Sequence, residues 1–356
     1  MSSNEKIAIV SNLTSGGGVV YKNNLLGKIP SIKKLEYFPR KMIIQKNKLL
    51  RIVYYIKYVY IDLFRDYYDI SQKINKNKDI NKVIVFQDSY IKAPYLLLFL
   101  KKKVLYILHE PPREFYEPIS MHAPRNTDKL FNYFIRLPIK YIDLYLTKKA
   151  THIISNSEYS KKIIRKIYNK DSIMIYPGIG LNENLPIKFP SRENVCISVG
   201  SLLPYKGHAE SIKAVSEIKQ NRPKLIIIGN GTHKSKNYLI QLAHGLNVEI
   251  EVKNSISDKE LTNEYLKAKV YINNAFFEPF GLAALEAIFC GCVLVTNETG
   301  GTKELKKYFP NKVLISESMK HNMSIMIQKG FKIKNRIPNK SKTFDWKNIA
   351  KLIKEI

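Results

Sequence analysis

Two glutamates beside an apolar helical stretch are the side chains in this sequence best placed to do chemistry. Glu278 and Glu286 lie on either side of the segment Phe280-Gly281-Leu282, shortly after the apolar run Val270–Asn273. The pattern predicts a buried strand, a loop carrying Glu278, and a helix beginning near Gly281. The free N–H groups and dipole at such a helix start favour an anion, and buried carboxylates are rare without a polar partner. This combination indicates a ligand with both hydroxyls and phosphates, and a nucleotide-sugar fits that description.

Two other segments carry groups that bind anions directly after predicted strands. Gly16, Gly17 and Gly18 follow the first apolar run and precede a helical stretch, so their N–H groups could approach a phosphate. Their spacing is not G-x-G-x-x-G, and a flexible turn remains the alternative. Lys206 follows the apolar run Val195–Gly200 and could hold a diphosphate as a point charge. In a chain with 59 basic residues, a solvated surface lysine is the alternative.

Alternating apolar runs and helical patterns predict parallel sheets buried on both faces, which is an α/β fold. In the first half the predicted strands are Lys6–Ser11, Val83–Gln87, Val104–His109, His152–Ser155 and Ser172–Tyr176. In the second half they are Val195–Gly200, Lys224–Gly229, Val248–Val252, Val270–Asn273, Val293–Thr296 and Val313–Ile315. We therefore expect two doubly wound, Rossmann-like domains that face each other across a cleft, with ligands beyond the strand ends.

The expected domains are residues 1–180 and 193–340. Residues 181–192, which contain Pro186 and Pro190 and almost no apolar periodicity, read as the linker. Residues 341–356 are expected to form a C-terminal helix that packs back towards the first domain.

Composition narrows the classes of partner. The chain has 356 residues with 45% hydrophobic residues, which excludes a disordered chain, and its net charge is +29. Residues 1–190 carry 33 basic and 15 acidic side chains, a balance of +18, and the rest carry 26 and 15, a balance of +11. Nucleic acid, anionic lipid and phosphorylated substrates are all compatible with this excess. Three cysteines favour a reducing compartment, and we expect neither a signal peptide nor a membrane span.

The ordered motifs of the chain resemble those of family-four, group 1 glycosyltransferases, which have the GT-B fold. The E-x7-E signature corresponds to Glu278 and Glu286. The matching blocks, in chain order, are residues 154–157 (ISNS), 176–179 (YPGI), 228–231 (IGNG), 255–261 (SISDKEL), 274–282 (NAFFEPFGL), 286–295 (EAIFCGCVLV) and 300–305 (GGTKEL). Each block is modest alone, but the ordered set is specific and covers most of the chain.

The resemblance implies roles for individual residues in binding a nucleotide-diphosphate sugar. Glu278 would hold the donor sugar's hydroxyls and Glu286 the ribose hydroxyls, while Lys206 would neutralise the leaving diphosphate. Backbone contacts to the donor would come from Phe280, Gly281 and Leu282. Gly16, Gly17 and Gly18 would close over the phosphate from the first domain.

His109, at the end of a predicted strand, matches the position of a histidine near the reacting sugar in the family. A satisfied structural histidine is the alternative at this position. Ser201 stands where the family commonly has an arginine, so half of the usual cationic clamp on the donor is missing. Slower chemistry, a compensating basic residue elsewhere or a donor held differently would each be consistent with that change.

The family transfers hexoses with retention at the anomeric carbon. We expect no metal site and no cofactor, because Lys206 and N–H groups would replace a divalent ion and no Asp-x-Asp occurs in the sequence. The expected acceptor is a glycolipid, a lipid-linked oligosaccharide or another glycan. Glycosylation of DNA, and a catalytically inactive binding protein with the same fold, remain the alternatives.

The segment from Arg40 to Tyr68 interleaves basic, aliphatic and aromatic residues at roughly helical spacing. Basic amphipathic helices with aromatic anchors lie on anionic membrane surfaces. An ordinary helix packed on the first sheet is the alternative. The expected location is the cytoplasm, and the membrane interpretation of this segment adds peripheral attachment to the inner face of the membrane. Nucleic acid is the less favoured partner.

Overall fold

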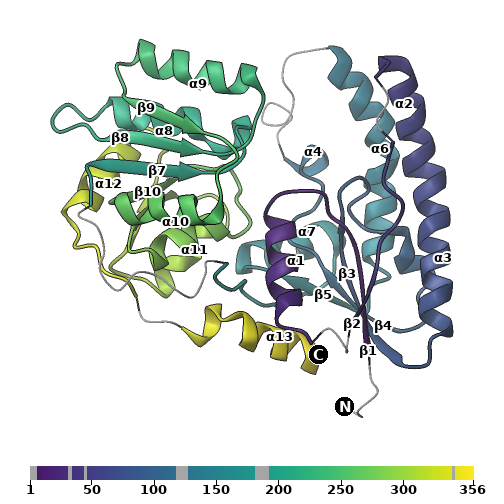
Figure 1. Ribbon diagram of the computed structural model, residues 1–356. Helices are drawn as coiled ribbons and strands as arrows, with labels where there is room; N and C mark the ends of the chain where they lie inside the picture. The colour runs from purple at the N-terminus through teal and green to yellow at the C-terminus, as the bar shows by residue number, and fades with distance from the viewer. Residues whose placement is uncertain (1–5, 31–33, 44–45, 118–126, 181–191, 339–340) are drawn as a thin grey trace. The chain divides into compact units, whose positions relative to one another are not determined.

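The computed structural model describes residues 6–30, 34–43, 46–117, 127–180, 192–338 and 341–356. The chain forms two compact units (Figure 1). The first contains Met1–Gly178 together with Trp346–Ile356, and the second contains Ile179–Asp345. The predicted linker, residues 181–192, falls almost entirely outside the described residues.

The first unit is built on a six-stranded, all-parallel sheet in the order β2-β1-β3-β4-β5-β6. The strands are β1 (Lys6–Asn12), β2 (Lys34–Tyr37), β3 (Ile80–Asp88), β4 (Lys103–Ile107), β5 (His152–Ser155) and β6 (Ile173–Met174). The α-helices are α1 (Gly17–Gly27), α2 (Lys48–Lys57), α3 (Leu63–Lys76), α4 (Arg113–Tyr116), α6 (Thr127–Thr147), α7 (Glu158–Tyr168) and α13 (Trp346–Glu355). A π-helical turn, η2 (Tyr58–Asp62), joins α2 to α3, and η3 (Tyr95–Leu98) is a 3-10 turn.

The second unit has its own six-stranded parallel sheet, in the order β12-β11-β10-β7-β8-β9. Its strands are β7 (Val195–Val199), β8 (Lys224–Ile228), β9 (Ile250–Lys253), β10 (Val270–Asn273), β11 (Val293–Asn297) and β12 (Val313–Ser316). The helices are α8 (His208–Ser216), α9 (His233–Gly245), α10 (Asp258–Lys267), α11 (Leu282–Phe289) and α12 (His321–Lys332). Short 3-10 turns are η4 (Pro204–Lys206), η5 (Thr302–Lys307) and η6 (Lys342–Phe344).

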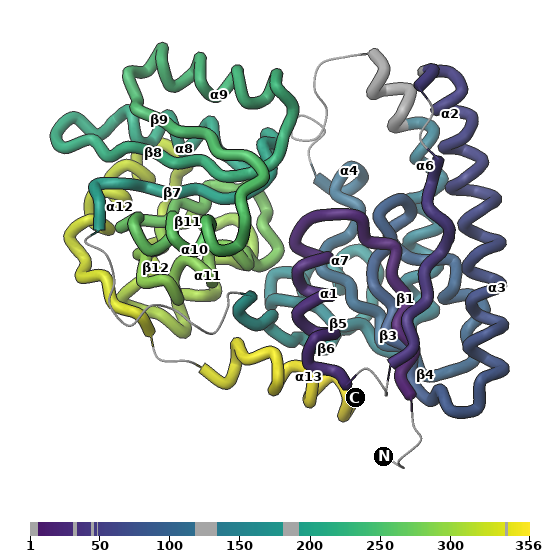
Figure 2. The backbone as a smooth tube through the Cα atoms, in the orientation of Figure 1, coloured from purple at the N-terminus to yellow at the C-terminus, as the bar shows by residue number. Residues whose placement is uncertain are grey.

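Both faces of the first sheet are buried, as an all-parallel sheet requires. Alternate residues of β1 enter different cores: Ala8 and Val10 join the core that includes the η2–α3 segment, and Ile7 and Ile9 join a second core on the opposite face. The second core is closed by α1 and α13, which lie side by side (Figure 2). The C-terminal segment is therefore part of the first unit, although it follows the whole of the second in sequence.

The prediction of two doubly wound parallel sheets is confirmed, and each of the eleven predicted strands has a counterpart. Strand β2 was not predicted, because its sequence Lys-Leu-Glu-Tyr has no continuous apolar run. It lies at the edge of the sheet, and none of its residues is fully buried. The C-terminal helix was predicted to begin at residue 341. It begins at Trp346, and the turn before it, η6, belongs to the second unit.

Among the described helices, none combines the length and the hydrophobicity needed to cross a bilayer.

Candidate functional site

Three loops of the second unit meet at one edge of its sheet because β7, β10 and β11 are parallel neighbours. Val270 of β10 lies beside Cys196 of β7 on one side and Val293 of β11 on the other. The carboxyl ends of the three strands therefore open towards the same edge, where ligands of such sheets bind. The loops that follow them are residues 200–207, 274–281 and 298–301, and they carry five of the predicted site residues: Ser201, Lys206, Glu278, Phe280 and Gly281.

The loops after β7 and β10 bring Lys206 and Glu278 together. The Nζ atom of Lys206 lies 2.6 Å from Oε2 of Glu278. The two side chains are only 23% and 16% exposed, so the ion pair lies in a partly desolvated place where it is stronger than on an open surface. The pairing itself was not predicted, although each residue was singled out separately.

The position of Lys206 is fixed by close backbone packing between these two loops. The amide of Phe276 donates a hydrogen bond of 2.8 Å to the carbonyl of Tyr205. Gly207 has φ of +67°, and a Cβ atom there would lie 1.9 Å from the carbonyl oxygen of Asn274. Only glycine fits this conformation and this approach, so Gly207 permits the contact that places Lys206 next to Glu278.

The third loop holds the backbone of Glu278. The amide of Gly301 donates a hydrogen bond of 2.7 Å to the carbonyl of Glu278, and Gly300 forms an isolated bridge with it. Gly300 has φ of +87°, and a Cβ atom would lie 2.4 Å from the same carbonyl oxygen. The glycine pair of the motif GGTKEL thus has a structural explanation: it lets the loop after β11 pack closely against the backbone of Glu278.

Helix α11 begins next to the ion pair of Lys206 and Glu278, and no side chain caps its first turn. Gly281, its N-cap residue, has φ of +91°, and the hydroxyl of Thr302 lies 2.7 Å from where its Cβ would be. Thr302 is in turn held by a 2.9 Å hydrogen bond from the side-chain amide of Asn273. An uncapped helix start carries partial positive charge and N–H donors, which suit a phosphate.

The ring of Phe280 is buried and packs at a centroid distance of 6.4 Å from Phe344. Only its backbone is therefore suited to contact a ligand, which is the role predicted for it. Ser201 follows β7 on the loop that ends at Lys206 and supplies no charge.

Glu286 lies within α11 and is buried among residues of the second unit. Burial and, to a smaller extent, the nearby charge of Asp258 raise the pKa of its carboxyl group to about 7, while the hydroxyl of Tyr265 opposes the rise. The buried carboxylate that the sequence singled out is thus one whose charge changes near neutral pH.

The remaining predicted residues lie in the first unit. His109 follows β4, and its backbone is anchored on both sides: its amide donates to Oε1 of Gln87 at 3.2 Å, and its carbonyl accepts from Ser160 at 2.8 Å. Among the described residues, neither of its ring nitrogens has a hydrogen-bond partner. Burial lowers the pKa of the imidazole to about 4, so the ring is neutral at physiological pH.

The ring of Tyr21 in α1 meets His109 edge-on at a centroid distance of 4.5 Å, and Trp346 of α13 meets Tyr21 at 4.9 Å. This aromatic support of the histidine was not predicted. No local pattern indicates it, because the residues come from three distant parts of the chain.

The three glycines were predicted to precede the helix, but α1 already begins at Gly17, so Gly16 is its N-cap residue and Gly17 and Gly18 belong to its first turn. Gly16 has φ of +82°, so glycine is favoured there for conformation, although a Cβ atom would meet nothing within 4 Å. No side chain caps the start of α1. The geometry suits an anion, while phosphate binding by this turn stays a prediction.

Other polar residues at the edge of the second sheet were missed as well. Asn230 accepts hydrogen bonds of 3.1 Å from both the amide and the hydroxyl of Ser255, which links the loops after β8 and β9. Both residues lie within motif blocks recognised in the sequence, IGNG and SISDKEL, and that is the signal that could have singled them out.

Comparison with known proteins shows which family and which solved structures this chain is similar to. Residues 182–329 match the family model described as "Glycosyl transferases group 1". The uncharacterized glycosyltransferase MJ1607 of Methanocaldococcus jannaschii is 25% identical over 240 residues, which are 60% of this chain and 60% of that protein. The phosphatidylinositol N-acetylglucosaminyltransferase GPI3 subunit of Saccharomyces cerevisiae is 23% identical over 257 residues, or 65% of this chain and 56% of that one. The chain thus spans little more than half the length of these curated relatives.

A solved structure, Anabaena Alr3699/HepE in complex with UDP and glucose, superposes with a TM-score of 0.67 at 16% identity, covering 99% of this chain and 98% of that one. The expected GT-B fold is confirmed, and residues 182–329 match the expected family.

We expect Gly207→Ala to destabilise the second unit by more than about 1 kcal/mol, because it adds a steric clash to a positive φ. Thermal unfolding of the full chain measures this. Gly245→Ala, at the end of α9, is the matched control: a Cβ atom there meets nothing within 4 Å and the backbone is not left-handed. Equal melting temperatures for the two variants would contradict the packing role of Gly207.

Proposed function

We propose that this chain is a group 1 glycosyltransferase that transfers a hexose with retention from a nucleotide-diphosphate sugar to a lipid-linked or glycolipid acceptor. The observation that carries the proposal is the ion pair of Lys206 and Glu278, next to the uncapped start of α11. The cation and the N–H donors suit the phosphates of such a donor, and the carboxylate suits its sugar hydroxyls.

The leaving diphosphate makes the largest electrostatic demand on the protein. As the anomeric bond breaks, negative charge grows on the diphosphate and positive charge on the sugar ring, and preorganised groups of opposite sign stabilise both. Lys206 and the N–H groups of Gly281 and Leu282 serve the diphosphate in this proposal. Glu278 accepts hydrogen bonds from the sugar's hydroxyls and faces the positive ring. We expect no divalent metal to be required, since these cationic and N–H donors take its place.

Lys206 has to serve two anions, because Ser201 brings no second cation to this loop. A lysine already paired with Glu278 can approach a diphosphate without a new charge being buried, since its ammonium group has three donors. The same pairing holds the Glu278 carboxylate beside the ammonium group of Lys206. We infer that the pair acts as one unit in which Lys206 bridges Glu278 and the donor's phosphates.

Two named relatives support the substrate classes. The yeast relative acts, by its name, on phosphatidylinositol, which favours a lipid acceptor here. The Anabaena structure holds UDP and glucose, which favours a nucleotide-diphosphate hexose as donor. His109, with its neutral ring held near Tyr21, stays the residue expected near the reacting sugar, and Gly16–Gly18 stay the expected phosphate turn.

A donor screen tests the activity itself. We expect release of nucleoside diphosphate from one of the UDP-, GDP- or ADP-hexoses, stimulated by a lipid-linked acceptor and unaffected by a chelator. Duplex DNA serves as the alternative acceptor. Stimulation by DNA alone would indicate that the enzyme glycosylates DNA. If calorimetry detects no binding of any nucleotide-sugar, the chain is a catalytically inactive binding protein with the same fold.

Substitution of the ion pair should abolish transfer. Lys206→Ala and Glu278→Ala are each expected to lower kcat by about 100-fold or more, the loss typical of one preorganised charge-stabilising group. Steady-state kinetics with the preferred donor measures this, and circular dichroism confirms folding. Lys213→Ala is the control, because Lys213 also pairs with a glutamate, Glu210, at 3.6 Å but on helix α8. Near-normal turnover of Lys206→Ala or Glu278→Ala would refute the assignment.

Glu286 should make donor affinity depend on pH. Its pKa of about 7 means that the carboxylate form, which accepts hydrogen bonds from ribose hydroxyls best, becomes dominant only above neutral pH. We expect affinity for the nucleotide-sugar to rise by about tenfold as the pH is raised from below that pKa to above it, and Glu286→Gln to remove the rise. A nucleotide-sugar is the right probe, because its diphosphate has no proton that titrates in this range. An unchanged pH profile in Glu286→Gln would contradict the role in donor binding.

The same carboxyl group links stability to pH. Because its pKa is raised on folding, its contribution to stability is fully present below about 4.5 and is lost as pH rises through about 7. We expect the wild type to lose up to about 3 kcal/mol across that window relative to Glu286→Gln. Parallel denaturant titrations of the two proteins measure the difference.

A further inference from the structure

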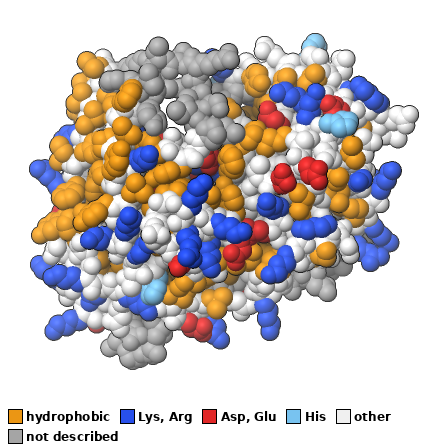
Figure 3. Space-filling model, turned by 180° about the vertical axis from the view of Figure 1, so that it is seen from behind, with side chains coloured by type: hydrophobic (Ala, Val, Ile, Leu, Met, Phe, Trp, Pro, Cys, Tyr) orange, Lys and Arg blue, Asp and Glu red, His pale blue; other side chains and the backbone are white. Residues whose placement is uncertain are grey.

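An exposed apolar stripe runs along the helical rod formed by α2, η2 and α3 in the first unit. Its residues recur every three or four positions and are between 39% and 70% exposed, with one half-buried tyrosine among them: Leu49, Val53, Ile56, Tyr60, Phe64 and Tyr68. Leu50 and Tyr54 widen the stripe at its α2 end. On the side of the molecule where this rod lies, hydrophobic side chains gather over a broad area (Figure 3).

The opposite side of the rod is firmly attached to the protein, so the stripe cannot turn inward. Tyr58, Leu63 and Tyr67 are buried in the core of the first unit. The hydroxyl of Tyr67 donates a hydrogen bond of 2.6 Å to the buried carboxylate of Asp88, and that of Tyr58 donates to the carbonyl of Arg40 at 2.8 Å. The side of the rod that carries the stripe therefore stays exposed among the described residues.

Helix α6 extends the apolar surface. The hydroxyl of Tyr60 donates a hydrogen bond of 2.6 Å to the carbonyl of Ile135, which places the two elements in contact. The exposed rings of α6 are Phe134, Tyr141 and Tyr145, at 57% to 63% exposure. The spacing of seven and four positions places these rings on one face of α6. Tyrosines with an apolar ring and a wet hydroxyl suit an interface between water and lipid.

The charge around the α2 end of the stripe has one sign. Residues 38–61 contain six basic residues and no acidic one. Among them, Lys41, Lys46 and Arg51 are exposed. This distribution favours an anionic partner and disfavours a cationic one.

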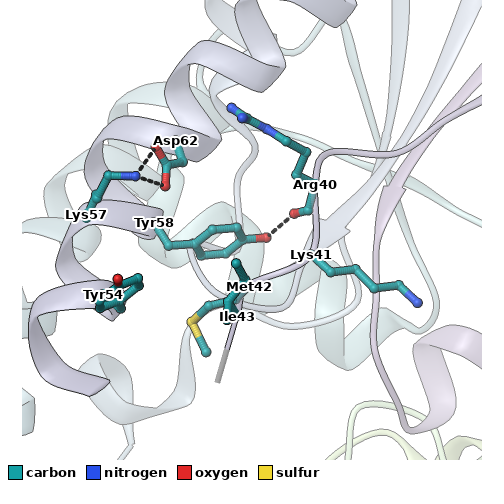
Figure 4. Close-up of a pocket in the computed structure, with 8 residues that line it drawn as sticks. All are labelled: Arg40, Lys41, Met42, Ile43, Tyr54, Lys57, Tyr58 and Asp62. Atoms are coloured by element: carbon teal, nitrogen blue, oxygen red, sulfur yellow. Dashed lines mark hydrogen bonds and ion pairs between the residues drawn. The ribbon is translucent and has the colours of Figure 1, made fainter. Parts of the chain in front are cut away.

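A small crevice lies between the segment that contains Lys41 and the α2–η2 helix (Figure 4). It is not a phosphate site, because two of its cations are already neutralised. Lys57 contacts both oxygens of Asp62 at 2.9 and 3.0 Å, and the guanidinium of Arg40 lies 2.6 Å from Asp66. The charge available to a partner is therefore spread over the surface, as electrostatic attraction to a bilayer requires, and is not concentrated in one pocket.

We infer that this face, defined by the stripe, the α6 rings and Lys41, Lys46 and Arg51, docks the protein on an anionic lipid bilayer. The exposed leucine, isoleucine and valine side chains decide between bilayer and nucleic acid, because aliphatic groups gain nothing from a phosphate backbone but gain free energy in the acyl boundary. The inference deepens the proposed function by giving the lipid-borne acceptor a surface through which the enzyme reaches it.

Vesicle flotation of the full chain tests the docking face. We expect binding to phosphatidylcholine vesicles containing one third phosphatidylglycerol, and much weaker binding to phosphatidylcholine alone. Val53→Glu should lower the partition coefficient at least tenfold. Ile240→Glu, at a 43% exposed position of α9 in the second unit, is the matched control and should bind as the wild type does. Equal binding by Val53→Glu and the wild type would overturn the inference, as would equal binding to both kinds of vesicle.

Site-specific labelling shows whether the stripe enters the lipid. The native cysteines Cys196, Cys290 and Cys292 are free and buried, and burial raises the pKa of each thiol, so a polarity-sensitive label should react selectively with Val53→Cys. A blue shift is expected on adding anionic vesicles, and none for a label at Ile240→Cys. No shift at either position would overturn insertion.

Nucleotide-diphosphate release with a water-soluble acceptor, measured on the same variants, separates this inference from the proposed function. Normal release by Val53→Glu together with lost flotation would support both. Normal flotation with no release by any variant would refute the transferase activity while leaving the docking face intact.

Discussion

The contact between Lys206 and Glu278 depends on the order of strands in the second sheet. The two residues are far apart in sequence, and they meet because β7 and β10 are parallel neighbours whose following loops leave the same edge. The glycines at 207 and 300 then allow the backbones to approach closely enough for the side chains to pair. Strand order thus brings a cation and a carboxylate together beside the start of α11, at the edge where the ligand is expected.

The same edge combines rigid and titratable parts. Backbone hydrogen bonds and glycine contacts fix the loops, whereas Glu286, buried within α11, changes charge near neutral pH because burial penalises its ionised form. The first unit shows the same contrast: the backbone of His109 is anchored by Gln87 and Ser160, while its ring stays neutral and its nitrogens have no partner among the described residues. Such groups are costly for stability, which is the usual sign of a functional demand.

The strands and the match of residues 182–329 to a family model were predictable, because apolar runs of parallel strands and the blocks around Glu278 and Glu286 are local in sequence. The Lys206–Glu278 contact was not, since it needs the spatial order of strands, which no short pattern encodes. The support of His109 by Tyr21 and Trp346 was hidden for the same reason, as α13 follows the second unit in sequence but packs in the first. The edge strand β2 was missed because an edge position needs no apolar run. The segment Arg40–Tyr68 suggested an amphipathic helix, but only the burial of individual residues shows that an apolar face is directed outward.

The central claim is that Lys206, paired with Glu278, meets the diphosphate of the donor at the start of α11. A crystal structure of the protein with an unreacted nucleotide-sugar tests it most directly. The account predicts the diphosphate within hydrogen-bond distance of Lys206 Nζ and of the N–H groups of Gly281 and Leu282, with the sugar's hydroxyls on the carboxylate of Glu278. A nucleotide bound elsewhere, with Lys206 out of reach of its phosphates, would contradict it.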